Sequence, residues 1–157
     1  MILIPNFQRG IDYILDFCNS NPDLFVRRVG SDGHAGALPF TSRFSSLKSN
    51  NMPSNLIDHI FDNGDWDKDL RDLYFFIQIQ RYYPGDYIVP HKDNYNITKL
   101  HLVTLTSSDC DGIILQTGDD MLEKVFDKAG QKIESDLNDY HWVDPCRDLR
   151  YSLVITE

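Results

Sequence analysis

Residues 74–83 read YFFIQIQRYY, an aromatic and β-branched run that predicts a β-strand. Polar and apolar side chains alternate along it. Because neighbouring side chains of a strand point to opposite faces, one face carries Gln78, Gln80 and Tyr82, and the other carries Ile77 and Ile79. Polar residues that face inward suit a binding site better than a dry core.

Other segments downstream also have strand patterns. Leu100–Thr106 and Arg150–Thr156 alternate, and Gly112–Gln116 is a short apolar run. Between residues 123 and 135 a glycine ends a short polar turn, DKAG at 127–130, which predicts a β-hairpin.

Two helices are predicted upstream of residue 74. Apolar residues at helical spacing predict the first helix from about residue 6 to 19: Phe7, Ile11, Ile14, Leu15 and Cys18. The second begins near Ser54, a suitable N-cap, and ends at Asn63-Gly64. Its apolar stripe consists of Leu56, Ile57, Ile60 and Phe61. The Gly-, Ser- and Asn-rich segment 29–51 predicts irregular structure with one short strand.

Helices followed by closely spaced strands indicate a mainly β chain with N-terminal helices (α+β). We expect an antiparallel barrel or sandwich with the helices packed on one outer face. With 157 residues the chain fits a single domain, 1–157, in which about 1–70 form a helical support and about 71–157 form the barrel.

Composition excludes several classes of protein. The formal net charge of -9 argues against nucleic-acid and anionic-membrane partners, which require an excess of Lys and Arg. No apolar run approaches the roughly 20 residues of a membrane helix, and the start lacks the pattern of a secretion signal. Three cysteines without CxxC spacing favour neither a disulfide framework nor a structural zinc site. We expect a mature, soluble, cytoplasmic protein.

A metal site is indicated by IVPHKDN, residues 88–94. His91 and Asp93 are two positions apart, so on an extended backbone both can reach one ion. His141, about fifty residues downstream in DYHWVDP, is the expected third ligand. Two imidazoles and one carboxylate leave positions open on an octahedral ferrous ion, as oxygen-activating sites require.

Three further histidines compete for the role of ligand. His34 lies in the Gly-rich segment, and His59 lies in the second predicted helix. His101, on a predicted strand, is the most serious rival, but a strand histidine hydrogen-bonded to a neighbour is the favoured interpretation.

Arg150 is the candidate anion anchor. It follows His141 by nine residues and shares a strand face with Ser152, while Tyr151, Leu153 and Ile155 occupy the opposite face. A guanidinium that points into a barrel is costly unless an anion meets it, and its planar fork matches a carboxylate. The alternative is an Arg that pairs with an internal Asp or Glu.

These residues together resemble the Fe(II)/2-oxoglutarate-dependent dioxygenase superfamily, and in particular its prolyl 4-hydroxylases. The resemblance covers the C-terminal half. QRYYPGDYIVPHKDN looks like the strand entering the site of prolyl 4-hydroxylases and of AlkB-related nucleic-acid demethylases, and HWVDPCRDLRYSLVI looks like the closing segment of prolyl hydroxylases. The chain departs from the pattern in two ways: Leu100–Ser107 contains no Tyr, and Arg150 stands where collagen-type enzymes usually have Lys.

The resemblance implies a double-stranded β-helix (jelly-roll) barrel, with His91, Asp93 and His141 as iron ligands and catalytic residues. It also implies that Arg150 and Ser152 contact the distal carboxylate of 2-oxoglutarate. Tyr82 is implied as a further contact, with Tyr83 as its alternative. The cofactors implied are Fe(II), 2-oxoglutarate and dioxygen, with ascorbate as an optional reductant.

The expected reaction is hydroxylation of a C–H bond, first in a prolyl or other protein side chain. The alternatives are a free amino acid or small metabolite, then AlkB-like oxidation of a nucleobase, which the acidic balance disfavours. Aromatic residues flank the predicted ligands and could line the substrate entrance: Tyr87, Tyr140 and Trp142. Two rivals are a cupin-like module that binds metal without catalysis and a pseudo-enzyme that serves as an interaction scaffold.

Overall fold

The alternating strand at residues 76–82 lies in the larger of two antiparallel β-sheets. A computed structural model describes residues 2–4, 10–30, 42–67, 69–74, 76–92, 99–118, 121–135 and 140–157. The large sheet has the order β1 (Ile2–Ile4), β9 (Lys132–Ser135), β6 (Leu100–Thr104), β11 (Arg150–Thr156), β4 (Phe76–Tyr82), β3 (Ser42–Lys48) and β2 (Val26–Gly30). The small sheet has the order β5 (Ile88–His91), β10 (His141–Val143), β7 (Gly112–Gly118) and β8 (Met121–Phe126).

β4 and β11 pair along their whole length at the centre of the large sheet. Their register places Arg150 opposite Tyr82 and Ser152 opposite Gln80. Directly opposite residues of an antiparallel pair point to the same face, so these four side chains share the face toward the small sheet. The predicted alternation of both strands is confirmed.

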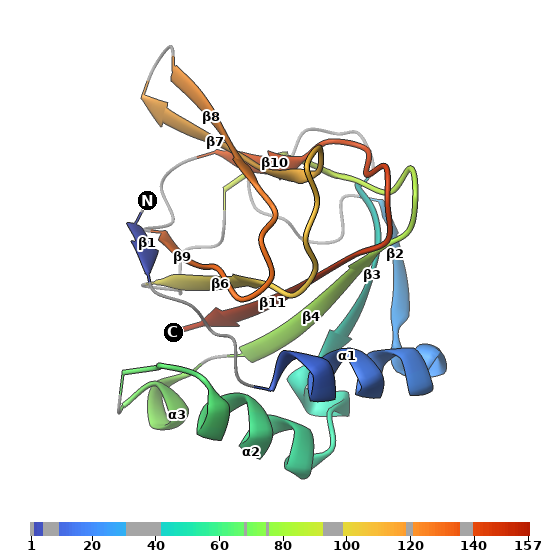
Figure 1. Ribbon diagram of the computed structural model, residues 1–157, viewed down its shortest axis with the longest axis vertical. Helices are drawn as coiled ribbons and strands as arrows, with labels where there is room; N and C mark the ends of the chain where they lie inside the picture. The colour runs from blue at the N-terminus through green and yellow to red at the C-terminus, as the bar shows by residue number, and fades with distance from the viewer. Residues whose placement is uncertain are drawn as a thin grey trace.

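The helices cover the other face of the large sheet (Figure 1). They are α1 (Ile11–Ser20), α2 (Ser54–Asn63) and α3 (Leu70–Leu73), with 3-10 turns at Pro22–Leu24 and Ser49–Asn51. Ile79, Leu153 and Ile155 from the strands meet Ile14 and Leu56 from the helices in one core, and all five are 0% exposed. Burying each such side chain contributes about 1.5–3 kcal/mol. Helices packed on one outer face of antiparallel sheets agree with the expected class.

Two smaller apolar clusters lie between the sheets. One joins Leu100, Leu102 and Val154 of the large sheet to Ile113 and Leu115 of the small one. The other joins Phe44 and Tyr82 of the large sheet to Ile88 and Val143 of the small one, together with Cys146. The two layers therefore pack on each other around a partly polar interior.

The hairpin predicted at residues 123–135 is wrong. β8 pairs with β7 in the small sheet, whereas β9 pairs with β1 and β6 in the large sheet. Residues 127–131 thus cross from one layer to the other. Local turn chemistry cannot separate such a crossing from a hairpin, because a glycine with a positive φ, such as Gly130 at 87°, suits both.

The segment 29–51 contains more regular structure than predicted. β3 is a full seven-residue strand that pairs with β2 and β4. Ser42, Ser45 and Ser46 are at most 1% exposed, so small hydroxyl side chains fill this part of the sheet. Serine has a low strand propensity, which made the segment look irregular.

The predicted helices agree in place and differ slightly in extent. α1 begins at Ile11, after Gly10 with φ 83°, and the expected first turn falls on residues 6–9, outside the described part of the chain. α2 spans Ser54–Asn63 as predicted, although Pro53 rather than Ser54 is its N-cap residue.

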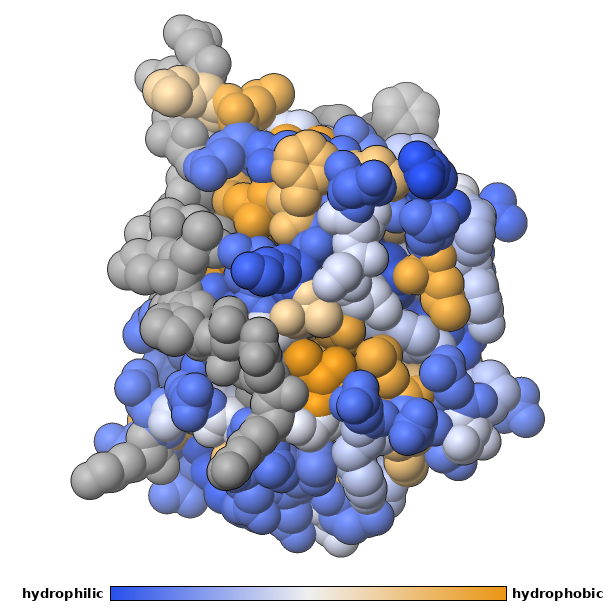
Figure 2. All heavy atoms as spheres, viewed as in Figure 1, coloured by the Kyte–Doolittle hydropathy of each residue, from blue (hydrophilic) through white to orange (hydrophobic). Residues whose placement is uncertain are grey.

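The visible surface is mainly hydrophilic and carries several small apolar patches, one of them at the projecting end of the β7–β8 pair (Figure 2). Met121 and Leu122 are 66% and 64% exposed there. Among the described residues, no helix has the length and apolar character needed to span a membrane.

Candidate active site

A cavity opens between the two sheets where their polar residues face each other. Gln78, Gln80, Tyr82 and Arg150 line it from β4 and β11. His91, His141 and Trp142 line it from β5 and β10. Apolar side chains complete the wall, among them Leu102, Ile113 and Val154. This mixture of apolar wall and a few convergent polar groups is typical of a small-molecule site.

The two predicted histidine ligands lie side by side in this cavity. His91 on β5 is the direct register partner of His141 on β10, and the centroids of their rings are 4.3 Å apart. Both are buried, with exposures of 3% and 6%. Strand pairing alone therefore brings together residues that are fifty positions apart in the chain.

The donor chemistry of this pair suits a divalent transition metal. Nδ1 of His91 lies 2.8 Å from the carbonyl oxygen of Val89, so Nδ1 carries the proton and donates it. Nε2 then has the lone pair that a metal ion requires. Asp93, the predicted third ligand, lies outside the described residues. The histidines fit an Fe(II) site, and the role of Asp93 stays a prediction.

The rival histidines lie elsewhere. His101 is on the face of β6 that carries Val103 of the helix-side core, and its ring nitrogens are 3.4 and 3.3 Å from oxygens of Glu134 and Glu157. It is a strand histidine with acidic neighbours. His59 on α2 contacts the carbonyl oxygen of Gly10 at 3.1 Å. His34 falls outside the described residues.

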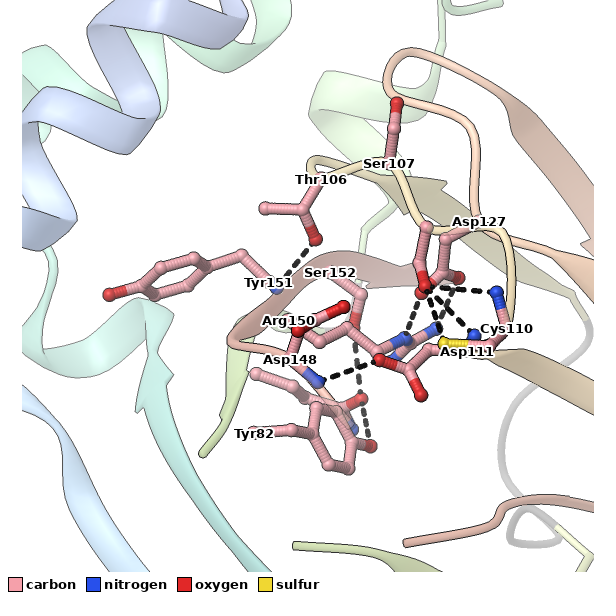
Figure 3. A network of polar contacts seen from close by, with 12 residues as sticks. Tyr82, Thr106, Ser107, Cys110, Asp111, Asp127, Asp148, Arg150, Tyr151 and Ser152 are labelled. Carbon is pink, nitrogen blue, oxygen red and sulfur yellow. Dashed lines mark hydrogen bonds and ion pairs between the residues drawn. The ribbon is translucent and has the colours of Figure 1, made fainter. Parts of the chain in front are cut away.

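Arg150 lines the cavity and also has an internal partner. Its Nε and Nη2 donate to the carboxylate oxygens of Asp127 at 2.8 and 3.2 Å, and its exposure is 2% (Figure 3). Burial acts to lower the pKa of Arg150, but Asp127 and Tyr82 outweigh it and the pKa is raised. The guanidinium is therefore charged, and the alternative of an internal acidic partner is present together with the cavity position.

Tyr82, Ser152 and Gln80 form a hydrogen-bonded group beside Arg150. The hydroxyls of Tyr82 and Ser152 both donate to Oε1 of Gln80, at 2.9 and 3.2 Å. The Arg150 Cζ lies 5.0 Å from the centroid of the Tyr82 ring. Burial raises the pKa of Tyr82, so its hydroxyl stays protonated as a donor. Tyr83, the alternative contact, is 43% exposed and stacks on Arg81 instead.

Comparison with known proteins gives structural matches only, since no family model and no curated protein matches the chain. A 2OG-Fe(II) oxygenase family oxidoreductase from Burkholderia pseudomallei superposes with a TM-score of 0.68 at 15% identity, over 99% of this chain and 83% of that one. A prolyl-4-hydroxylase from Pseudomonas putida gives a TM-score of 0.67 at 12% identity, over 99% and 90%. The α-ketoglutarate-dependent epimerase SnoN from nogalamycin biosynthesis gives 0.70 at 12% identity, over 99% and 76%.

The chain has the fold of the 2OG-Fe(II) oxygenases. At 15% and 12% sequence identity this likeness concerns the fold alone. The prediction of a prolyl 4-hydroxylase-like scaffold is confirmed at this level.

The aromatic residues expected at the entrance occupy different positions within the oxygenase fold. Trp142 lines the cavity beside His141. Tyr140 is 36% exposed, and the Lys92 Nζ lies 4.8 Å from the centroid of its ring. Tyr87 forms an isolated antiparallel bridge with Arg43. Of the three, Trp142 alone is among the described residues that line the cavity.

Cys110, Asp111 and Asp148 also bring metal-binding atoms together, all within 4.8 Å of one another. The carboxylate of Asp111 already accepts backbone hydrogen bonds from Arg147 and Asp148, at 2.8 and 3.1 Å. It therefore anchors the segment before β11.

Sequence reasoning missed Asp127, which it placed in a hairpin turn. In that interpretation the side chain would face solvent, yet in the oxygenase fold it is buried against Arg150. No local signal in DKAG distinguishes these outcomes. The one sequence feature that pointed to such a residue is Arg150, whose alternative interpretation required an internal Asp or Glu.

Proposed function

We propose that the chain is an Fe(II)- and 2-oxoglutarate-dependent dioxygenase, an oxidoreductase that hydroxylates a C–H bond. His91, Asp93 and His141 would hold the iron, and Arg150, Ser152 and Tyr82 would hold the cosubstrate. The supporting observation is that His91 and His141, with ring centroids 4.3 Å apart, line the same cavity as Arg150. We further propose that the two sheets form the double-stranded β-helix of a single domain, 1–157.

When bound, the iron would activate dioxygen, which is the oxidant, and 2-oxoglutarate would supply two electrons and leave as succinate and carbon dioxide, with ascorbate as an optional reductant. The chain contributes positioning. Val89 orients the imidazole of His91. The charge of Arg150 complements a carboxylate, while the apolar wall limits the access of water.

The proposed substrate is a prolyl or other protein side chain. Trp142 at the cavity, together with Tyr87 and the more exposed Tyr140, would contact it. The likeness of the closing segment to prolyl hydroxylases supports a peptide, whereas a free amino acid or small metabolite is the second candidate because a small-molecule epimerase has the same fold. A nucleobase ranks third because of the net charge of -9, and a membrane partner is not proposed.

Anaerobic spectroscopy tests the metal and cosubstrate sites directly. Addition of Fe(II) and 2-oxoglutarate should produce a weak visible charge-transfer band. The variants His91→Ala, Asp93→Ala and His141→Ala should lose this band, while His101→Ala should keep it, since His101 lies on the opposite sheet face. Retention of the band in His91→Ala would refute the ligand assignment.

This spectroscopic test, together with a turnover assay, separates the rival classes of protein. A cupin-like module would bind zinc without giving the band. A pseudo-enzyme would give no succinate in a turnover assay with 2-oxoglutarate, whereas the proposed enzyme releases it even with a generic substrate.

A reducing compartment such as the cytoplasm is the proposed location. Cys18, Cys110 and Cys146 are all free thiols. Such a compartment also suits ferrous iron.

A further inference from the structure

Asp127 is the first residue after β8, where the chain leaves the small sheet for the large one. Its backbone is held on both sides: its N–H donates to the carbonyl oxygen of Asp111 at 3.0 Å, and its carbonyl oxygen accepts from the Ser108 N–H at 3.1 Å. Its side chain is 2% exposed. The carboxylate is therefore a fixed anion inside the protein.

Asp127 engages one edge of the Arg150 guanidinium. The edge formed by Nε and Nη2 faces the two carboxylate oxygens, as Figure 3 shows. This pairing leaves Nη1 outside the ion pair, on a side chain that lines the cavity. A guanidinium has five N–H groups in a planar fork, so fixing one edge also fixes the direction of the other.

An Arg at this depth needs such a partner before any ligand arrives. The Arg150 side chain is 2% exposed, and an unpaired buried cation is strongly unfavourable. Without Asp127 the side chain would be expected to turn toward other acceptors or toward water. The acidic partner thus keeps both the charge and the orientation in place.

We propose that Asp127 is a positioning residue that holds Arg150 with its Nη1 edge toward the carboxylate of the bound cosubstrate. The identity of that ligand rests on the proposed function. Asp127 is not among the described residues that line the cavity, so its effect on the ligand would be indirect. It acts through Arg150 from a segment that joins the two sheets.

Substitution and chemical rescue test the proposal. Asp127→Ala should raise the KM for 2-oxoglutarate about ten- to a hundredfold, since a hydrogen bond to a charged group is being misaligned, while kcat changes little. Formate should enter the space left by the carboxylate and lower that KM again. Wild-type protein should show no such response to formate.

Thermal unfolding gives a readout independent of activity. Asp127→Ala should melt below the wild type, and formate should raise its melting temperature more than that of the wild type. Asp86→Asn is the matched control, because Asp86 is a buried carboxylate paired with Arg27 at 2.5 Å and does not line the cavity. It should lose stability without a change in the KM for 2-oxoglutarate.

The outcomes separate the two proposals. Failure of wild-type protein to bind 2-oxoglutarate would refute the proposed function before any variant is made. A wild-type KM in Asp127→Ala, or a raised KM that formate leaves unchanged, would overturn the positioning role. If Asp127→Ala does not fold, Asp127→Asn decides the matter: it keeps the shape, and an unchanged KM would refute the proposal.

Discussion

Gln80 connects the polar residues of the cavity through a single oxygen atom. Its Oε1 accepts from the hydroxyls of Tyr82 and Ser152, so its amide nitrogen is the remaining polar end of the side chain. Since Gln80 lines the cavity, this nitrogen is a donor that a ligand between Arg150 and the histidines could meet. The orientation of the amide depends on both hydroxyls.

Replacement of Tyr82 by Phe tests this dependence. The ring should keep its place against Phe44, whose centroid is 5.6 Å away, so stability should change by about 1 kcal/mol or less beyond the lost hydrogen bond. The amide of Gln80 would lose one of its two restraints. We expect the KM for 2-oxoglutarate to rise roughly threefold to tenfold. An unchanged KM, measured beside Tyr83→Phe as the exposed control, would contradict this role.

The buried cysteines predict a loss of stability at alkaline pH. Burial raises the pKa of the Cys18 thiol from 9.0 to about 12, and burial likewise raises the pKa of the Cys146 thiol to about 12. Above pH 9 the unfolded chain releases these protons while the folded chain keeps them. The unfolded state then binds fewer protons, so the free energy of unfolding falls as the pH rises from about 9 to 12.

Denaturant unfolding at several pH values measures this effect. A Cys18→Ala, Cys146→Ala double variant should be less stable at pH 7 but should lose less stability between pH 9 and 11 than the wild type. An equal slope for both proteins would show that other groups control the alkaline transition.

At the residue level, the sequence predicted correctly which side chains of a strand share a face. Alternation separated Gln78, Gln80 and Tyr82 from Ile77 and Ile79, and the structure confirms both groups. Asp127 was not predictable, because its partner lies 23 positions away on another strand. Nor does strand spacing alone show that His91 and His141 are register partners.

The elements show where local patterns stop being informative. The strands β4, β6, β7 and β11 and the helices α1 and α2 follow from periodicity. Periodicity does not predict the crossing at residues 127–131, because the sheet that a strand joins depends on its tertiary partners. It does not predict the serine-rich β3 either, because the burial of small side chains depends on those partners too.

Gly10, at the start of α1, packs against α2, so its replacement by Ala should destabilise the protein more than the same change at Gly85. Gly10 has φ 83°, and a Cβ there would overlap the imidazole of His59 on α2. Gly85 has φ 89° with no atom within 4 Å of the added Cβ. Gly85→Ala should cost about 1–2 kcal/mol from backbone strain alone, and Gly10→Ala should cost more.

Chemical denaturation of both variants checks this order. A Gly10→Ala, His59→Ala double variant should be less destabilised than the sum of its single changes, because the overlap is removed. Strict additivity would show that the helix contact is not the cause.

At the scale of the whole molecule, apolar packing among the described residues joins the layers. Three apolar clusters hold the helices to the large sheet and the two sheets to each other. The fold class was predictable because most strands follow the predicted helices, although β2 and β3 lie between α1 and α2. The pairing of layers was not, since it depends on contacts between distant segments.

Metal removal should therefore leave a folded protein. Chelation should keep the far-ultraviolet circular dichroism unchanged and lower the melting temperature by roughly 5–10 °C relative to protein at a hundredfold excess of ion over its Kd, corresponding to about 2.7 kcal/mol. Manganese or nickel can replace iron in this measurement to avoid oxidation. Complete unfolding on chelation would contradict the packing described above.

The histidines and Arg150 belong to different sheets. β5 and β10 carry the former, and β11 carries the latter. A small molecule bound by the histidines and by Arg150 at once would link the two sheets and restrain their separation. Amide hydrogen exchange at β5, an edge strand of its sheet, should then slow when the molecule is present, giving a signal of occupancy without any turnover.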